Sequence, residues 1–484
     1  MAPWFPTVLL LSASLSAAAS DLSLVEAVKQ GNKEAVRSLL NQRIDVNVAQ
    51  PDGTTALAWA AERADLEMAE LLIRAGANVN AANDYGATPL WLACTDANPA
   101  MVEKLLSAGA DPNLRLLSGE TALMAASETG STDAVKLLLA HGADINAKET
   151  RGGQTALMWA VAERHAETAK VLTERGADLN ARSNRGYTAL LFAAQEGDTE
   201  SARTLLAAGA NINLGAENGT NPLLMASASG QERMVALLLD KGANPNAADH
   251  DGYTALHYAA SGRNKVESVK NLLAHGASPN ARLIKDLSKG DLNATPVGAT
   301  PFFLAAANRN VPVMRLLAAS GADPLLPTAE TLFLNAQNGF RLQVVANTTP
   351  LIAAAGADRV RNNYPEFTED EEKNAIEAVK LALELGADIN AVNDYGQTAL
   401  HLAAYLKADK LVQFLVEKGA KTEVFDNFGQ TPLSIAARII TVGVKESYDM
   451  SPRRDNESTV KVLLNMGAKP LAASGVKVYQ EPVR

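Results

Sequence analysis

Apolar and polar positions alternate along this chain in a regular long-range pattern. Apolar stretches such as AVKLLLAHG over 134–142 are separated by polar stretches rich in Gly, Asn and Asp, such as NAANDYGAT over 80–88. Apolar residues at helical spacing predict amphipathic helices, and the polar stretches carry the residues that form turns. The pattern therefore predicts pairs of short helices joined by turns and repeated along the chain.

Two short tags mark the repeat. Gly-Ala-x-x-Asn begins at Gly76, Gly109, Gly142, Gly176, Gly209, Gly242, Gly276 and Gly386. Thr-(Ala or Pro)-Leu-x-x-Ala begins at Thr55, Thr88, Thr121, Thr155, Thr188, Thr254, Thr398 and Thr431. The Gly tags from 76 to 276 lie 33 or 34 residues apart. Neither helix of a repeat buries its apolar face alone, so the repeats are expected to stack.

Each tag has a physical explanation. A Thr side chain caps the start of a helix, and Pro in the first turn, as in Thr88-Pro89, leaves no hydrogen bond unmade. A Gly after the second helix, such as Gly142, supplies the left-handed residue that ends a helix. The tags thus predict a unit of turn, helix, turn and helix.

These tags resemble the ankyrin repeat, most clearly in DGYTALHYAA at 251–260 and DYGQTALHLAA at 394–404. The resemblance covers 22–471 and implies an all-α solenoid of about 12 helix-turn-helix units with inter-repeat β-hairpin loops. It also implies that His257 and His401, at the signature His of the family, form hydrogen bonds between neighbouring units. Residues 22–47 lack the Thr tag and are expected to form an N-terminal cap, and 472–484 a polar tail.

Four segments break the spacing, and all lie in the C-terminal half. They are 281–299, 329–347, 357–372 and 438–456, with 12, 16, 16 and 15 residues more than the standard distance between tags. The first two are expected to lengthen inter-repeat hairpins, and the other two the loop between paired helices. Insertions in repeat proteins map to loops, often on a binding face.

The second insertion has the pattern of a β-hairpin. Apolar residues recur at every second position on both sides of Asn338-Gly339, a strong turn signal: Leu332, Leu334, Phe340, Leu342 and Val344. An isolated hairpin is marginal in water, so this one is expected to lean on neighbouring repeats or on a partner. The alternative is that it only covers a weak seam between repeats.

The N-terminal residues predict export. An apolar run in MAPWFPTVLLLSASLSAAASD is followed by Ala17, Ala18 and Ala19, which predicts a signal peptide over 1–19, although no Lys or Arg precedes the run. The alternative is a disordered or misassigned start. Cys94 is the only cysteine, so no intramolecular disulfide is expected, and an exported chain of this kind fits a bacterial periplasmic or secreted protein. No later apolar run is long enough for an integral membrane segment.

Composition and motifs argue against several functions. A net charge of −10 and a pI near 5.3 disfavour nucleic-acid binding. The chain has no P-loop, no Gly-x-Ser-x-Gly and no His-Glu-x-x-His, and none of its six histidines is paired at metal-ligand spacing. The acidic start of 367–386 is interpreted as a capping box of Thr368 and Glu371. We expect no catalysis, cofactor or metal site, and a monomer.

A binding face follows from the resemblance, because ankyrin arrays bind through hairpin tips and the exposed side of the first helices. The tip candidates are Tyr85, Arg185, Tyr187, His250, Tyr253, Asp394, Tyr395 and Phe428. The helix candidates are Trp91, Tyr405, Glu62, Arg63, Asp96, Glu128, Glu163, Gln195 and Glu196. Tyr, Trp and Arg are enriched at binding hot spots, and the alternative is that the tyrosines pack tip against tip. Trp59 and Trp159 are expected to pack between helices.

The sequence thus predicts a non-catalytic scaffold that presents a concave groove of hairpin tips and inner helices to a protein partner in the cell envelope or outside the cell. The main contact is placed in the C-terminal half, where Leu332, Leu334, Phe340 and Leu342 form one lip. Two alternatives stay open. One is an enzyme whose site is built in the C-terminal insertions, and the other is a secreted host-directed or toxin-like factor.

Overall fold

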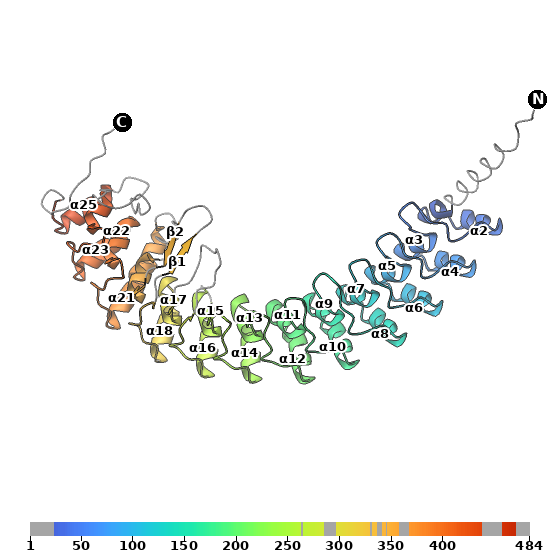
Figure 1. Ribbon diagram of the computed structural model, residues 1–484, viewed down its shortest axis with the longest axis horizontal. Helices are drawn as coiled ribbons and strands as arrows, with labels where there is room; N and C mark the ends of the chain where they lie inside the picture. Colours follow the sequence, from blue (N-terminus) through green and yellow to red (C-terminus); the bar gives the residue numbers. More distant parts are fainter. Residues whose placement is uncertain are drawn as a thin grey trace, which may run out of the picture. The chain divides into compact units, whose positions relative to one another are not determined.

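A computed structural model describes residues 24–262, 265–284, 297–329, 332–335, 341–344, 346–357, 367–437 and 457–470. The chain divides into two compact units, an N-terminal unit that ends at Glu217 and a C-terminal unit that begins at Asn218. Each unit consists of pairs of short helices joined by tight turns, with a longer hairpin loop leading from one pair to the next (Figure 1). The predicted fold class, a helix-turn-helix solenoid, is confirmed.

The N-terminal unit contains six helix pairs. Residues 24–29 are helical and precede α2 (Lys33–Asn41). The other pairs are α3 (Ala56–Glu62) and α4 (Leu66–Arg74), α5 (Pro89–Thr95) and α6 (Pro99–Ser107), α7 (Ala122–Glu128) and α8 (Thr132–Ala140), α9 (Ala156–Ala162) and α10 (Ala166–Glu174), and α11 (Ala189–Glu196) and α12 (Thr199–Ala207). First helices pack on first helices and second helices on second helices, so the core runs continuously through the unit.

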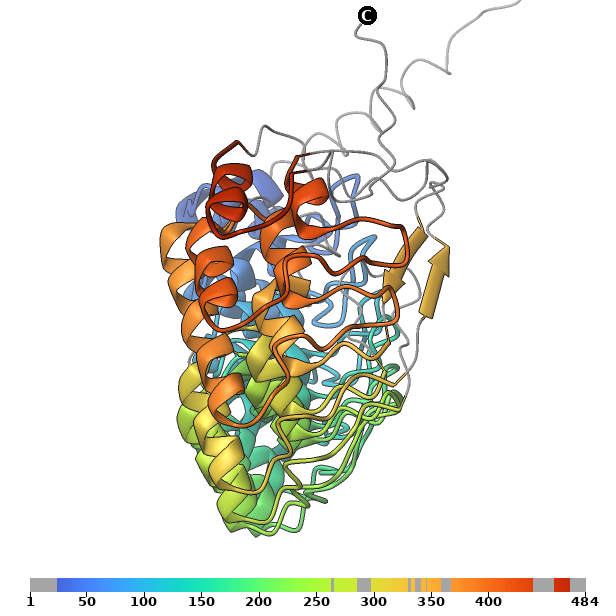
Figure 2. The same ribbon diagram turned by 90° about the vertical axis from the view of Figure 1, so that its left-hand side faces the viewer.

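The C-terminal unit also contains six pairs. They are α13 (Pro222–Ser229) and α14 (Glu232–Asp240), α15 (Ala255–Ser261) and α16 (Val266–Ala274), α17 (Pro301–Ala307) and α18 (Val311–Ala319), α19 (Pro350–Ile352) with the π-helical turn η1 (Ala353–Ala357) and α21 (Glu369–Glu384), α22 (Ala399–Tyr405) and α23 (Asp409–Glu417), and α24 (Pro432–Ala436) and α25 (Glu457–Asn465). In this unit the helices lie on one side and the hairpin loops on the other, with β1 (Leu332–Asn335) and β2 (Arg341–Val344) on the loop side (Figure 2).

The Thr and Gly tags act as predicted. A tag Thr side chain accepts the backbone N–H three residues later in α3, α5, α7, α9, α11, α17, α19 and α24. Asn221 caps α13 in the same way. Gly142 has φ +85°, and an added Cβ would meet no atom within 4 Å, so backbone conformation alone selects glycine there.

The tag Asn makes an inter-repeat link that the sequence analysis did not predict. Asn80 Nδ2 donates to the carbonyl oxygen of Gly109 at 3.3 Å, and its Oδ1 accepts the N–H of Asp111 at 2.8 Å. Asn113 makes the same pair of bonds to the next repeat. The recurrence of Asn at the fifth position of eight Gly tags was the available signal. In the tag that begins at Gly321, this position is Leu325, which is apolar and 47% exposed.

The second insertion forms the predicted hairpin. Strands β1 and β2 pair antiparallel, with Leu332 opposite Val344 and Leu334 opposite Leu342. The first insertion also extends a hairpin, because its two ends pair through Leu283 N–H to Ala299 O at 3.1 Å and Gly298 N–H to Leu283 O at 2.8 Å.

The third insertion differs from the predicted loop. The α21 helix has 16 residues, whereas the other described second helices have nine. It begins early because Thr368 and Glu371 form the predicted capping box, and four acidic residues occupy its first turn. Part of the insertion therefore lengthens a helix. The insertion at 438–456 lies outside the described residues.

Candidate functional site

The hairpin tips are built by a polar side chain and a left-handed glycine. Asn83 Oδ1 accepts the N–H groups of Tyr85 at 3.1 Å and Ala87 at 2.9 Å. Gly86 has φ +85°, and a Cβ there would lie 2.8 Å from the carbonyl oxygen of Arg115 in the next hairpin. Since the turn leaves the backbone so little freedom, the direction in which the Tyr85 side chain leaves the main chain is fixed.

Neighbouring tips are linked by backbone hydrogen bonds. Leu117 N–H donates to Tyr85 O at 3.0 Å, and Asp84 N–H donates to Asp52 O at 2.9 Å. Two further bonds continue this row in the N-terminal unit, Thr150 N–H to Ser118 O at 2.9 Å and Asn184 N–H to Gly152 O at 2.7 Å. The tips of this unit thus form one ordered edge.

Two large apolar side chains at these tips point into solvent. Tyr85 is 69% exposed, and Leu117 at the adjoining tip is 79% exposed. The sequence analysis selected Tyr85 but missed Leu117, although Leu at a polar turn position was a signal. Arg185 and His250 are exposed tip residues, as predicted. A turn held by hydrogen bonds and a left-handed glycine does not need apolar side chains, so these two exposed residues on adjoining tips are candidates for partner contact.

The other aromatic tip residues are half-buried and pack within the array. Tyr187 contacts Phe192 with ring centroids 5.7 Å apart, and Tyr253 stacks on Tyr258 at 5.1 Å. Tyr395 contacts Phe428 of the adjoining tip at 5.6 Å. Only the contact between Tyr395 and Phe428 joins one tip to the next, as in the alternative of tip packing against tip. Tyr187 and Tyr253 pack on the first helix that follows their own tip. Partner binding by these residues stays a prediction.

The aromatic residues of the first helices are also half-buried. Trp91 on α5 and Tyr405 at the end of α22 both keep part of their surface open. Trp59 was expected to pack between helices, and its ring is half-buried. Its Nε1 donates to Gln50 Oε1 at 2.9 Å, and Lys29 Nζ lies 4.6 Å from its ring centroid. The exposed face of Trp59 thus receives a cation.

The acidic candidates lie at the ends of first helices. Glu62, Asp96, Glu128 and Glu163 are exposed, and no cation of a described residue lies within ion-pair distance of them. Partial burial raises the pKa of Glu128, and the nearby carboxylates of Glu163 and Glu120 raise it further. A carboxylate at a helix C-terminus is also disfavoured by the helix dipole. These acids therefore do not stabilise the fold.

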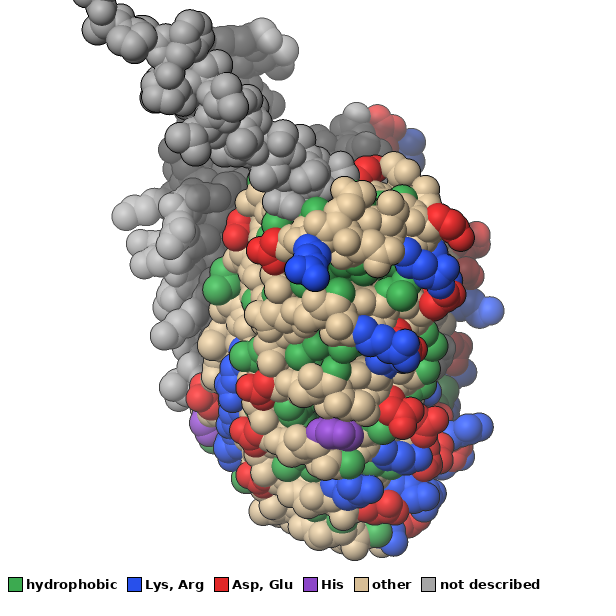
Figure 3. Space-filling model, turned by 90° about the vertical axis from the view of Figure 1, so that its right-hand side faces the viewer, with side chains coloured by type: hydrophobic (Ala, Val, Ile, Leu, Met, Phe, Trp, Pro, Cys, Tyr) green, Lys and Arg blue, Asp and Glu red, His purple; other side chains and the backbone are tan. Residues whose placement is uncertain are grey.

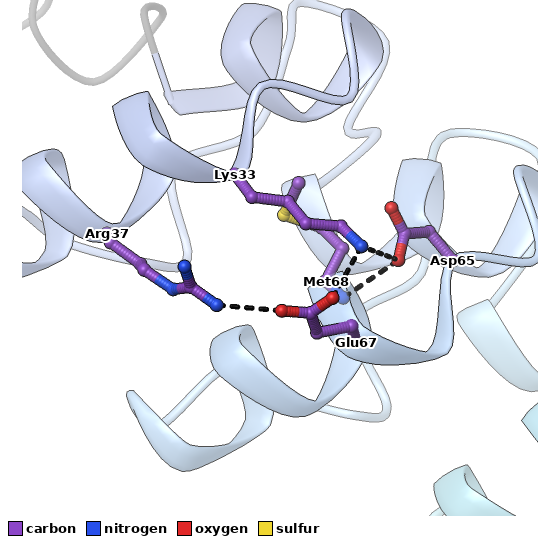
Figure 4. Close-up of polar contacts among 5 residues, drawn as sticks. All are labelled: Lys33, Arg37, Asp65, Glu67 and Met68. Atoms are coloured by element: carbon purple, nitrogen blue, oxygen red, sulfur yellow. Dashed lines mark hydrogen bonds and ion pairs between the residues drawn. The ribbon is translucent and has the colours of Figure 1, made fainter.

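The second helices show the opposite arrangement, because their charges are paired. Lys33 lies 2.6 Å from Glu67 and 3.5 Å from Asp65, and Arg37 lies 2.7 Å from Glu67 (Figure 4). The hydrogen bond from Lys33 lowers the pKa of Glu67, and the same bond raises the pKa of Lys33. Lys/Arg and Asp/Glu side chains lie next to one another along the right-hand side of Figure 3. Exposed pairs of this kind contribute little to stability.

The two signature histidines have a structural role, as predicted. The N–H of Thr254 donates to His257 Nδ1 at 3.2 Å, and His257 Nε2 lies 3.3 Å from Ala299 O in the next repeat. His401 makes the equivalent contacts, with Nε2 3.2 Å from Gln430 O. Burial lowers the pKa of each histidine to about 4, so both are neutral at pH 7. The Nδ1 atoms accept hydrogen bonds, so neither ring has a nitrogen free for a metal.

Four predicted contact residues lie on the hairpin of the second insertion. The structure gives the backbone pairing of Leu332, Leu334 and Leu342, and their side chains lie outside what it describes. Phe340 lies outside the described residues altogether. Binding by these four residues stays a prediction.

A family model matches most of the chain. The model of the family described as "Ankyrin repeats (3 copies)" matches residues 24–116, 98–183, 151–216, 190–283, 248–328 and 371–473. The chain belongs to the ankyrin-repeat family. Among solved structures, it is similar to the crystal structure of the human ASB11 ankyrin repeat domain, with 28% sequence identity and a TM-score of 0.42. That match covers 46% of this chain and 98% of the ASB11 chain. No curated protein matches the chain.

Ankyrin repeats generally mediate protein–protein binding and are typically non-enzymatic. In the part of the chain that the structure describes, no helix is both long enough and apolar enough to cross a membrane. The same residues contain no group of three or more His, Cys, Asp or Glu suited to hold a metal ion. Cys94 is buried, and burial raises the pKa of its thiol, which makes it a structural cysteine.

Proposed function

We propose that this ankyrin-repeat chain is a non-catalytic scaffold that binds a protein partner through its hairpin tips and the open side of its first helices. The observation that carries the proposal is the pair Tyr85 and Leu117, 69% and 79% exposed on adjoining tips and joined by a backbone hydrogen bond. An exposed tyrosine on a hydrogen-bonded turn suits a binding hot spot, and the exposed leucine on the adjoining tip adds apolar area for a partner. The half-exposed Trp91 on α5 adds apolar area on the helix side.

We also propose that the chain is exported and acts in a bacterial periplasm or outside the cell. The support is the apolar run and Ala17-Ala18-Ala19 in the first 21 residues, together with a single, buried cysteine. Intact-mass measurement of the native protein tests this proposal. A mass without residues 1–19 is expected, and a mass that includes them would contradict export by cleavage.

Affinity capture from a native envelope fraction tests the binding proposal. The bait is the full chain, compared with a Tyr85→Ala/Leu117→Ala variant and with a Lys136→Ala/Lys170→Ala control on the second helices of the same unit. A protein captured by the wild type and the control, but lost with the tip variant, supports the proposal. Equal capture by all three baits would place the contact elsewhere, first of all on the hairpin of β1 and β2.

A further inference from the structure

Three consecutive hairpins of the N-terminal unit gather positive charge. We call residues 114–119, 148–153 and 182–186 the basic edge. Its cations are all exposed: Arg115, Lys148, Arg151, Arg182 and Arg185. Its one carboxylate, Glu149, is buried and accepts the N–H groups of Arg151, Gly152 and Gln154. The edge therefore presents five cations and no exposed carboxylate in a chain with a net charge of −10.

Three of these five cations are held by hydrogen bonds, and none of the five forms an ion pair with a described residue. Lys148 Nζ donates to the carbonyl oxygen of Arg182 at 2.7 Å, and Arg115 Nη1 donates to that of Lys148 at 3.4 Å. Arg182 donates in the same way to the carbonyl of Gly215. Carbonyl partners leave the full charge on each side chain. Neither Arg151 nor Arg185 forms an ion pair with a described residue, whereas second-helix lysines of the same repeats do pair with acids.

The cations continue directly from the apolar pair. Leu117 lies within the basic edge, and its N–H is bonded to Tyr85 O at 3.0 Å. The bonds from Thr150 N–H to Ser118 O and from Asn184 N–H to Gly152 O hold the three hairpins in sequence. One side of the unit therefore presents two exposed apolar side chains followed by a row of cations, three of which are held by backbone carbonyls.

We propose that the basic edge, together with Tyr85 and Leu117, docks a short acidic segment of the protein partner. An apolar side chain of that segment packs against Tyr85 and Leu117, and its carboxylates pair with the cations. Guanidinium groups bind carboxylates with two parallel hydrogen bonds, which suits Arg151 and Arg185 in particular. The inference rests on the proposed function and adds the chemistry of the partner.

An acidic protein segment fits the surroundings better than a nucleic acid does. The basic edge is bounded by exposed carboxylates, Asp84 on the preceding tip and Glu217 on the following one. Glu128 and Glu163, without ion pairs, end first helices of the same repeats. A nucleic acid carries a negative charge on every phosphate, so it would be repelled by these carboxylates and by the net negative charge of the chain. A short acidic segment of a protein places its few carboxylates at the cations and avoids this repulsion.

Selection of peptides on the full chain tests the proposal. Phage-displayed random 12-residue peptides are panned at about 150 mM salt, where exposed charges are screened beyond roughly 8 Å. Binding of the enriched peptides is then measured by fluorescence anisotropy to the wild type and to an Arg151→Glu/Arg185→Glu variant. A Lys136→Glu/Lys170→Glu variant makes the same charge change on second helices of the same repeats and serves as the control. Circular dichroism melts check that all three are folded.

We expect acidic peptides with an apolar residue, whose affinity falls at least tenfold in the Arg151→Glu/Arg185→Glu variant and less than twofold in the control. Some peptides could lose affinity for the Tyr85→Ala/Leu117→Ala variant but bind the Arg151→Glu/Arg185→Glu variant as tightly as the wild type. That result would overturn this inference and leave the proposed function standing. Peptides that bind the wild type, the arginine variant and the tip variant with equal affinity would contradict both this inference and the proposed function. A labelled 12-nucleotide single strand that binds more tightly than the peptides, and is lost in the arginine variant, would assign the edge to nucleic acid instead.

Discussion

The side-chain oxygen of Asn80 accepts a 2.8 Å hydrogen bond from the backbone N–H of Asp111 in the next repeat. The amide nitrogen of the same side chain donates to Gly109 O at 3.3 Å. In repeats that carry the tag Asn, this side chain thus joins the turn after one second helix to the turn after the next.

Replacing this Asn should weaken the array locally. Asn80→Ala removes both bonds, and we expect the free energy of unfolding to fall by about 1 kcal/mol, because hydrogen bonds near the surface contribute about that much net. Urea unfolding followed by circular dichroism measures the change. Lys136→Ala, which removes only an exposed ion pair, is the control, and an equal effect from both substitutions would contradict a structural role for Asn80.

The tag sequences were sufficient to predict the repeat, the Thr caps and the left-handed glycines, because each of these depends on residues close in sequence. The bridge from each signature histidine to the next repeat was predicted from the resemblance to the ankyrin family, since Ala299 O lies 42 residues from His257. The Asn link and the basic edge were missed because their partners lie about one repeat away, as with Lys148 and Arg182. The half-exposed ring of Trp59 was missed for the same reason, since Lys29 belongs to the preceding repeat.

Acidification should destabilise the C-terminal unit through His257 and His401. Burial lowers the pKa of both to about 4, below the ordinary value of 6.5, so the unfolded chain binds protons more readily than the folded one. The free energy of unfolding is therefore unaffected by these histidines above about pH 6.5. As the pH falls toward 4, it decreases by on the order of 3 kcal/mol for each histidine.

Urea unfolding at pH 7, 6 and 5 measures this loss. His257→Met/His401→Met removes both titrating groups, and Met occupies the same tag position at Met124 and Met158. The variant should show a much smaller pH slope over this range. An unchanged slope would mean that other groups cause the pH dependence.

The thiol of Cys94 should not react in the folded protein. It is fully buried, and burial raises its pKa, so almost no thiolate forms at pH 8. Ellman's reagent should therefore label the native chain very slowly and label it completely in urea. Stoichiometric labelling of the native protein within minutes would show that the repeat around α5 opens readily.

Gly356 should be intolerant of a side chain. Its φ is +118°, and an added Cβ would collide with Cδ1 of Leu406, the residue that follows α22. Gly356→Ala is expected to destabilise the C-terminal unit by more than about 2 kcal/mol, because backbone strain and overpacking add. Gly76 also has a positive φ, but an added Cβ there would meet no atom within 4 Å. Gly76→Ala should therefore lower the free energy of unfolding by only about 1 kcal/mol. Equal thermal shifts for both variants would refute the packing role of Gly356.

The affinity of a purified partner for the tips tests the central claim most directly. Once a partner has been captured, its Kd is measured by isothermal titration for the wild type, for Tyr85→Ala/Leu117→Ala and for the Lys136→Ala/Lys170→Ala control. The tip variant should bind at least tenfold more weakly, since truncation of a hot-spot side chain typically loses more than about 1 kcal/mol, and the control should match the wild type. A folded tip variant with wild-type affinity would contradict a binding role for Tyr85 and Leu117.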